Sequence, residues 1–410
     1  TNTFDNNYTT LDAFAFNASN QRIELYWQDL YKTIHNANAV ANRIPAIDMN
    51  EANRDHLVAE ARYIRAMMYF EAVRLFGDVP LLLAETLDLN DAFAARSPAS
   101  DVYVAIVEDL KWSLDHLVWT QRLGLGRPTP MACAALLSKV YLEMGEYQEA
   151  ANAAQIVIES GLHPLFPQFG DLWKLENANS GEIIHAINYS GTLSQGFKPN
   201  QYHVRLLPGG LTDIGGPENG FGSERPTDDL INSFDPQDQR MAQSIFTSFT
   251  GDGGVTRFFE PHISKFWDRV NEPRGNNTDM DVIYLRTADI MLVYAEALNE
   301  INNGPNGVAY DMINQVRERA RFDGTQYLDI LPDLSGLGYQ AFKDAVLEER
   351  RWELVMEGQR YHDLVRHGKL VEKVNASGKE DVNAQATHTL WPIPQRERNL
   401  NKNLTQNTGY

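Results

Sequence analysis

Cysteine is almost absent from this chain of 410 residues, since Cys133 is the only one. One cysteine cannot form an internal disulfide, and no Cys/His spacing typical of a zinc site is present. Cys133 lies inside an apolar, helix-like stretch, so we expect it to be a small buried hydrophobic residue. The sequence therefore predicts neither disulfides nor a structural metal.

Long apolar runs are also absent, and none approaches the roughly 18 residues of a membrane-spanning helix. Basic residues are few: 36 Lys and Arg face 55 Asp and Glu, which gives a net charge of −19. Proteins that bind nucleic acid need a basic face against the phosphates. The composition argues against a nucleic-acid partner and is compatible with an uncharged ligand such as a sugar.

Recognisable catalytic motifs are missing as well. The chain has no G-x-S-x-G elbow and no H-E-x-x-H motif, and its ten His are scattered without ligand spacing. The Gly-rich stretches at 124–126 and 215–217 lack the strand–loop–helix context of a nucleotide site. We therefore expect no catalytic residue, no metal and no cofactor. A glycoside hydrolase stays open as the weakest alternative, because 55 acidic residues make carboxylate pairs abundant and uninformative.

What the sequence does have is helical periodicity. Apolar residues recur at helical spacing over 23–44 and 57–76, and Gly77 ends the second stretch. A third helix is predicted over 100–117. A last long helix is predicted from about 340 to 367, where Gly368 ends it.

Two stretches repeat one pattern. Residues 131–160 contain two Ala-rich helical segments joined by a Gly145-Glu146 turn, which is typical of a tetratricopeptide unit. Residues 285–321 repeat it across the loop 302–307. We therefore predict a mainly α fold, with tetratricopeptide-like helix pairs forming an α–α superhelix and an irregular insertion that carries short β-strands.

The insertion spans 161–284 and is rich in Gly, Pro and scattered aromatic residues. Residues 183–187 are predicted to be a strand, and 258–259 and 265–267 are candidates for short strands. Long irregular segments on a rigid scaffold often carry binding residues. This segment is therefore the predicted ligand-bearing part.

Sugar rings stack on aromatic side chains, and their hydroxyls bond amide, carboxylate and guanidinium groups. The aromatic candidates of the insertion are Tyr202, Phe221, Phe258, Phe259 and Trp267. Among them Tyr202, Phe221 and Trp267 are the leading predicted stacking residues, and the predicted polar residues are Asn219, Asp268 and Arg269. The competing interpretation is that Trp267 and its neighbours Phe258 and Phe259 are the core of a small sheet. A second candidate region contains Tyr8, Phe14 and Phe16.

Charged residues also recur beside the apolar stripes. We interpret them as Arg–carboxylate pairs that brace packed helices, rather than as catalytic groups. The set comprises Arg65, Arg74, Arg286, Glu296, Glu349, Arg350, Glu353, Arg360 and Asp363.

The end of the chain, 391–410, begins at Trp391 and ends at Tyr410. These aromatic ends predict a tail that is fixed onto the helical body instead of fraying.

Five segments, in order, resemble the SusD/RagB-like nutrient-binding lipoproteins of Gram-negative outer membranes: 27–38, 60–81, 285–297, 348–368 and 391–410. The resemblance implies one body over 1–410, comprising a helical part at 21–160, the insertion at 161–284 and a C-terminal part at 285–410. It implies a protein anchored to the outer cell surface by a lipid that is not part of this chain.

The resemblance also implies a function without catalysis. Such proteins capture an oligosaccharide and deliver it to a TonB-dependent, SusC-like outer-membrane transporter, which is expected to meet the helical side. The alternative from another class is a peptide-binding or scaffolding repeat protein.

Overall fold

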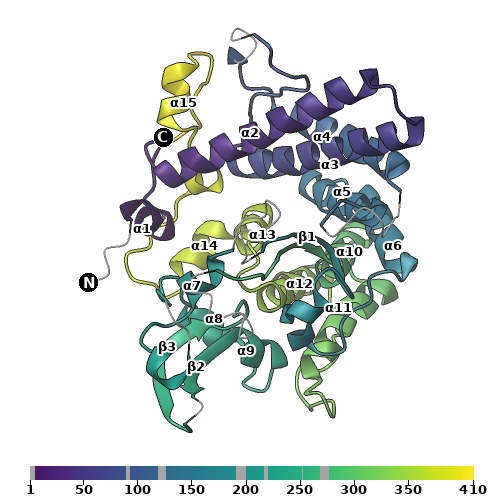
Figure 1. Cartoon of the computed structure of the whole chain (residues 1–410). Helices are drawn as coiled ribbons and strands as arrows, with labels where there is room; N and C mark the ends of the chain where they lie inside the picture. Colours follow the sequence, from purple (N-terminus) through teal and green to yellow (C-terminus); the bar gives the residue numbers. More distant parts are fainter. Residues whose placement is uncertain are drawn as a thin grey trace. The chain divides into compact units, whose positions relative to one another are not determined.

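The computed structural model describes residues 5–88, 93–118, 126–190, 200–216, 220–251, 253–267 and 277–410. It is mainly helical with a few short strands, as predicted (Figure 1). The chain divides into two compact units. Unit 1 comprises Thr1–Leu123, Arg127–Ala153 and Tyr361–Tyr410, and unit 2 comprises Gly124–Gly126 and Ala154–Arg360. The single body expected from the sequence stays a prediction.

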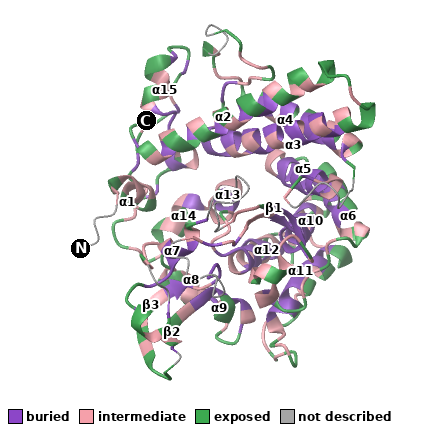
Figure 2. Cartoon of the chain, in the orientation of Figure 1, coloured by how far each residue is buried: buried purple, intermediate pink, exposed green. Residues whose placement is uncertain are grey.

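The long helices of unit 1 begin and end within a few residues of their predicted bounds, except that α3 starts six residues earlier. They are α2 (Gln21–Arg43), α3 (Glu51–Phe76), α4 (Ala99–His116) and α5 (Pro130–Met144). Asn20 caps α2 by accepting the backbone N–H of Arg22 and Ile23. Gly77 ends α3 at a φ of 69°, a backbone angle that favours glycine. Buried residues line these helices, most densely along α5 (Figure 2).

Both predicted helix pairs are present. In the first, α5 is followed by Gly145 in the left-handed conformation and then by α6 (Tyr147–Ser160). The division between the units falls within α6. In the second, α10 (Thr287–Asn302) packs against α11 (Gly307–Arg321). Cys133 is fully buried in α5, as expected, and burial raises the pKa of its thiol.

The prediction of one helix over 340–367 was wrong. The chain forms α12 (Tyr339–Glu353), a turn, and then α13 (Arg360–Arg366). The carbonyl oxygens of Glu353 and Val355 accept hydrogen bonds from the side chains of Arg286 and Lys265. Gly358 follows at a φ of 74°. In a continuous helix these two carbonyls would accept hydrogen bonds from backbone N–H groups of the next turn. Here they accept hydrogen bonds from Arg286 and Lys265, which are distant in the sequence.

Unit 2 contains two small antiparallel sheets. Strand β1 (Ile183–Ile187) has the predicted bounds and pairs with β4 (Val282–Arg286). Strand β2 (Ile245–Thr250) pairs with β3 (Thr256–Ile263), which contains the predicted strand residues 258–259. Residues 265–267 form a turn, so the prediction of a strand there was wrong.

Shorter helices complete the two units. They are α1 (Asn6–Asp12), α7 (Tyr202–Leu206), α8 (Asp228–Ser233), α9 (Gln239–Ser244), α14 (Leu370–Asn375) and α15 (Gln395–Leu400). Helices α8 and α9 lie beside the β2–β3 hairpin (Figure 1). No helix in the described parts of the chain is long and apolar enough to cross a bilayer.

The C-terminal tail is fixed onto unit 1, as predicted. The backbone N–H of Trp391 donates to the carbonyl of Leu75. The Asn407 amide nitrogen donates to the carbonyls of Phe76 and Trp391, at 2.9 and 2.7 Å. The Tyr410 hydroxyl donates to the carbonyl of Leu390 at 2.9 Å. The tail therefore closes the end of α3 instead of fraying.

The charged residues predicted to brace the helices mostly form ion pairs. Arg65 of α3 binds both oxygens of Asp109 in α4 at 2.7 Å, and Arg350 of α12 binds Asp289 of α10 at 2.7 Å. Arg74 and Asp363 pair within their own helices, with Glu71 and Arg366. The prediction that such pairs join packed helices is confirmed for Arg65 and Arg350, whereas Arg74 and Asp363 pair within a single helix.

In unit 2 a larger cluster buries ten charges. Five cations, Arg240, Lys265, Arg286, Arg317 and Arg319, meet five carboxylates, Glu182, Asp238, Glu349, Glu353 and Glu357. The charges therefore balance. Three of the cations, Arg240, Lys265 and Arg286, come from residues 240–286, and three of the carboxylates from α12 and the turn after it. The cluster consequently fixes the irregular segment onto the helices of the same unit.

A candidate ligand site on the insertion

The β2–β3 hairpin has one packed face. Phe246 lies opposite His262 and Phe249 opposite Arg257 in the strand register. Trp267 lies against this face, with its ring centroid 5.7 Å from that of Phe246 and 5.3 Å from that of Phe249. Trp267 is only 8% exposed. Its ring therefore supports the hairpin from inside, and its role in ligand binding stays a prediction.

Tyr202 opens α7 and belongs to a different packing cluster. Its ring lies 5.3 Å from that of Phe266, and its backbone N–H donates to the side chain of Asn200 at 2.8 Å. Burial, and after it the nearby Glu224, raises the pKa of its hydroxyl. The hydroxyl therefore stays protonated and can both donate and accept.

Phe221 is the one predicted stacking residue with a largely exposed ring, at 51%. Its backbone N–H donates to the carbonyl of Val204, which joins it to α7. The predicted polar residues Asn219, Asp268 and Arg269 lie outside the described residues.

The loop that carries Phe221 is fixed against the hairpin. Arg257 of β3 donates to the carboxylate of Asp213 at 2.6 Å and to the carbonyl of Gly210 at 2.7 Å. Gly222 has a φ of 56°, and a Cβ there would lie 2.5 Å from the His262 ring. This close approach requires glycine. The loop and the hairpin are thus held together and form one surface within unit 2.

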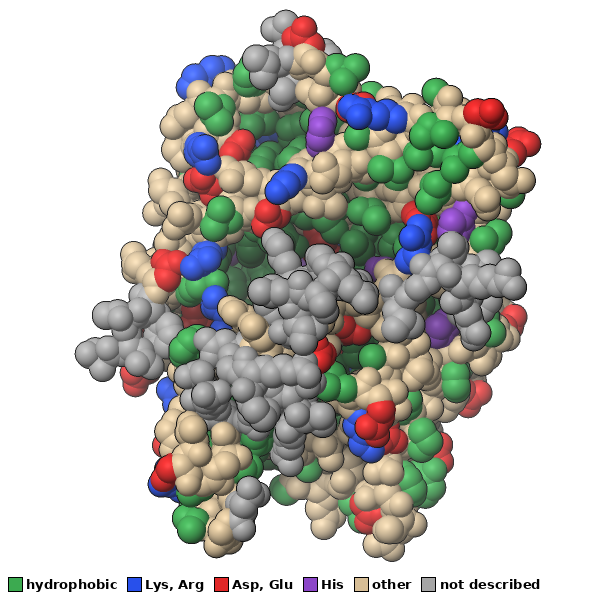
Figure 3. Space-filling view, viewed as in Figure 1, with side chains coloured by type: hydrophobic (Ala, Val, Ile, Leu, Met, Phe, Trp, Pro, Cys, Tyr) green, Lys and Arg blue, Asp and Glu red, His purple; other side chains and the backbone are tan. Residues whose placement is uncertain are grey.

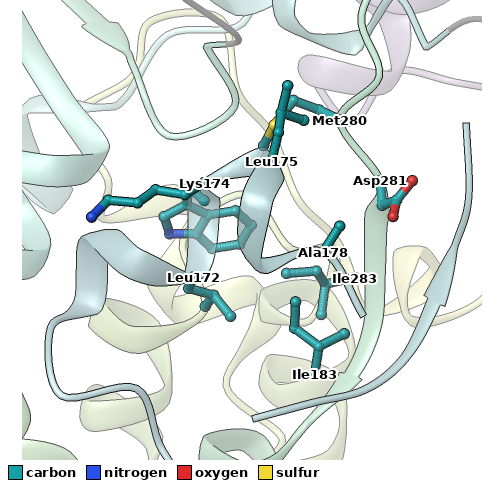
Figure 4. Close-up of a pocket in the computed structure, with 9 residues that line it drawn as sticks. Leu172, Lys174, Leu175, Ala178, Ile183, Met280, Asp281 and Ile283 are labelled. Carbon is teal, nitrogen blue, oxygen red and sulfur yellow. The ribbon is translucent and has the colours of Figure 1, made fainter. Parts of the chain in front are cut away.

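A small pocket lies in the same unit, between the segment 172–178 and strands β1 and β4 (Figure 4). Its walls are mostly apolar: Leu172, Trp173, Leu175, Ala178, Ile183, Met280 and Ile283, with Lys174 and Asp281 as the charged members. Asp281 accepts hydrogen bonds from Asn179, Asn188 and the backbone of Tyr189. Burial raises the pKa of this carboxyl.

In the second candidate region, near the N-terminus, the aromatic side chains mostly pack against other residues of the chain. Phe16 is buried and lies 5.0 Å from His388 and 6.1 Å from the Tyr410 ring. The Arg22 guanidinium covers the Tyr8 ring at 4.2 Å. These aromatic residues anchor the two ends of the chain in unit 1.

Charge on the visible surface is mixed. On the face shown in Figure 3, the described Lys and Arg side chains are scattered among acidic ones and form no continuous basic patch. In the described part of the chain, no group of three or more His, Cys, Asp or Glu is arranged to hold a metal ion.

Comparison with known proteins identifies the family. The sequence model of the SusD family matches residues 247–410, and a second one, described as starch-binding associating with outer membrane, matches residues 2–142. SusD-like protein P2 of Formosa agariphila is 31% identical over 422 residues, which cover 97% of this chain and 82% of that protein. The chain belongs to the SusD family.

Other similar proteins are also SusD-like. SusD-like protein P25 of Formosa agariphila is 29% identical over 455 residues, covering 98% of this chain and 83% of that protein. A SusD superfamily protein of Parabacteroides distasonis matches as a solved structure, with a TM-score of 0.87, 27% identity, and coverage of 98% of this chain and 89% of that one. The SusD/RagB-like resemblance and the tetratricopeptide-like fold predicted from the sequence are therefore confirmed.

Proposed function

We propose that this SusD-family protein binds an oligosaccharide without catalysis and delivers it to a SusC-like, TonB-dependent transporter. The observation that carries the proposal is the surface formed by the hairpin and the Phe221 loop. Its described residues combine aromatic rings with hydroxyl groups, and it is held rigidly by the ion cluster and by Arg257. Rigid sites lose little conformational freedom on binding. The description of the family model that matches 2–142 as starch-binding supports a glycan as the ligand.

The ligand contacts proposed here are the residues predicted from the sequence. Phe221 is the leading stacking residue, because its ring is already exposed. Tyr202 and Trp267 are proposed to line the deeper side, with Asn219, Asp268 and Arg269 as polar partners.

The carboxylates of the small pocket and of the buried cluster are engaged in other contacts. Cleavage of a glycosidic bond uses two carboxylates that face each other across the substrate. Of the described residues that line the small pocket, Asp281 is the one carboxylate, and its oxygens are already hydrogen-bonded. The carboxylates of the buried cluster are paired with cations away from solvent.

We further propose that the protein sits on the outer surface of the outer membrane through a lipid anchor. The family description of association with the outer membrane supports this location. Stacked helical repeats offer extended surfaces for protein partners. The transporter is therefore proposed to meet the helical repeats, leaving the insertion for the glycan.

The test is a binding screen of the purified protein by calorimetry against neutral glycans and peptides, with product analysis in parallel. We expect affinity for at least one glycan and no cleavage. Phe221→Ala should weaken that affinity, whereas Leu400→Ala, which removes another exposed apolar side chain, should not. Affinity for peptides alone would support the peptide-binding alternative, and product formation would support a hydrolase.

A further inference from the structure

The outward face of the β2–β3 hairpin carries an aromatic ring without a packing role. Along β3, Thr256 and Phe258 are exposed, whereas the alternating Arg257 and Phe259 are half-buried. Phe258 is 83% exposed. Packing therefore gives no reason for an aromatic residue at this position.

Small hydroxyl residues surround this ring. Ser248 lies directly opposite Phe258 in the register, and Thr250 lies opposite Thr256. The Thr250 and Thr256 hydroxyls are 2.9 Å apart and bond each other. Directly opposite residues share a face of a sheet, so the ring and these hydroxyls form one surface. Ser and Thr hydroxyls both donate and accept, which suits the hydroxyls of a sugar.

The opposite face holds this surface in place. Arg257, next to Phe258 in sequence, is tied to Asp213, and Phe246 and Phe249 pack on Trp267. The platform is therefore formed before any ligand arrives, and little conformational freedom is lost on binding.

The charges around Phe258 limit the kind of ligand that can bind this surface. The residues around the ring, Ser248, Thr250 and Thr256, are uncharged, and Glu260, two residues after Phe258 in the sequence, is exposed and acidic. The chain as a whole carries a net charge of −19. A polyanionic chain is disfavoured here, and a neutral ligand with apolar C–H faces and hydroxyls fits.

We propose that Phe258 and the hydroxyls of Ser248, Thr250 and Thr256 form a stacking platform for a neutral glycan, separate from the buried Trp267. This inference rests on the proposed function and names both a contact surface and the charge class of its ligand.

The test compares Phe258→Ala and Phe258→Tyr with the wild type and with Val255→Ala, a matched loss of an exposed apolar side chain at the end of the same hairpin. Each protein is titrated with a neutral glycan selected by the screen and with a sulfated form of that glycan. We expect Phe258→Ala to bind the neutral glycan at least about tenfold more weakly, as for an interface anchor. Phe258→Tyr and Val255→Ala should keep wild-type affinity, and the sulfated form should bind more weakly to the wild type.

Thermal unfolding should be unchanged in Phe258→Ala, because the side chain is exposed. Wild-type affinity in Phe258→Ala would overturn the platform while leaving the proposed function standing. If the wild type bound the sulfated and the neutral glycan with equal affinity, the inference that the ligand is neutral would be overturned. Loss of transporter binding by Phe258→Ala with unchanged glycan affinity would make this face a protein contact instead. A wild type that binds no glycan would overturn the proposed function, and the platform with it.

Discussion

Replacing Glu353 by Gln removes the carboxylate that touches the most cations in the buried cluster of unit 2. Glu353 accepts hydrogen bonds from Arg286, Arg319 and Arg240 and is fully buried. Burial alone would raise the pKa of Glu353, but these guanidinium groups outweigh it and hold the pKa below its ordinary value. The carboxylate is therefore charged at neutral pH and is needed in that form.

The expected loss follows from the charge balance. With Gln at position 353, five cations face four carboxylates, and one positive charge is left buried without compensation. Removing one partner of a buried ion pair costs about 3–5 kcal/mol in the free energy of unfolding. For a unit of this size, that corresponds to a fall of roughly 6–20 °C in melting temperature.

A matched control lies on the same helix. Glu348 of α12 pairs with Arg351 and Arg360 but is partly exposed, so Glu348→Gln should cost no more than about 1 kcal/mol. Urea titration of both variants followed by circular dichroism gives the two free energies. If Glu353→Gln and Glu348→Gln lost the same stability, the cluster would not be the element that fixes the insertion onto the helices of unit 2.

Three further changes test other contacts. Burial lowers the pKa of Lys265 to about 8 from 10.5, so between these values the unfolded chain binds more protons than the folded one. The free energy of unfolding of the wild type should therefore rise between pH 8 and pH 9.5. This rise should exceed the change in Lys265→Met over the same range by on the order of 1–2 kcal/mol. Parallel pH profiles of the two proteins would contradict this. Asn407→Ala should cost about 1–3 kcal/mol because two carbonyls lose their donor, whereas the exposed Asn399→Ala should stay within about 0.5 kcal/mol, as measured by urea unfolding. Trp267→Ala should cost about 3–5 kcal/mol by calorimetry, and an unchanged melting temperature would show that its ring does not support the hairpin.

Local patterns were enough to predict most of the long helices. The apolar spacing in α2 and the Gly145 turn between α5 and α6 depend on nearby residues only, so their bounds could be read from the sequence. The break after α12 could not be predicted in the same way. It depends on Arg286 and Lys265, which lie far from α12 in the chain and donate hydrogen bonds to the carbonyls of Glu353 and Val355.

The candidate site was only partly predictable for a related reason. Composition marked the insertion as rich in aromatic rings but could not separate the buried Trp267 from the exposed Phe258. The alternation of exposed and half-buried residues along β3 could have assigned Phe258 and Phe259 to opposite faces, had the strand been predicted in full. Burial of Trp267 depends on long-range packing against Phe246 and Phe249 and left no local signal.

The most direct test of the central claim is hydrogen–deuterium exchange of the wild-type protein with and without the neutral glycan that binds it best. We predict that the glycan slows exchange in the backbone of residues 200–222 and 245–263, and leaves α3 and α5 unchanged. Slower exchange confined to the helices of unit 1, or no change with any glycan of the panel, would contradict the assignment of glycan binding to the insertion.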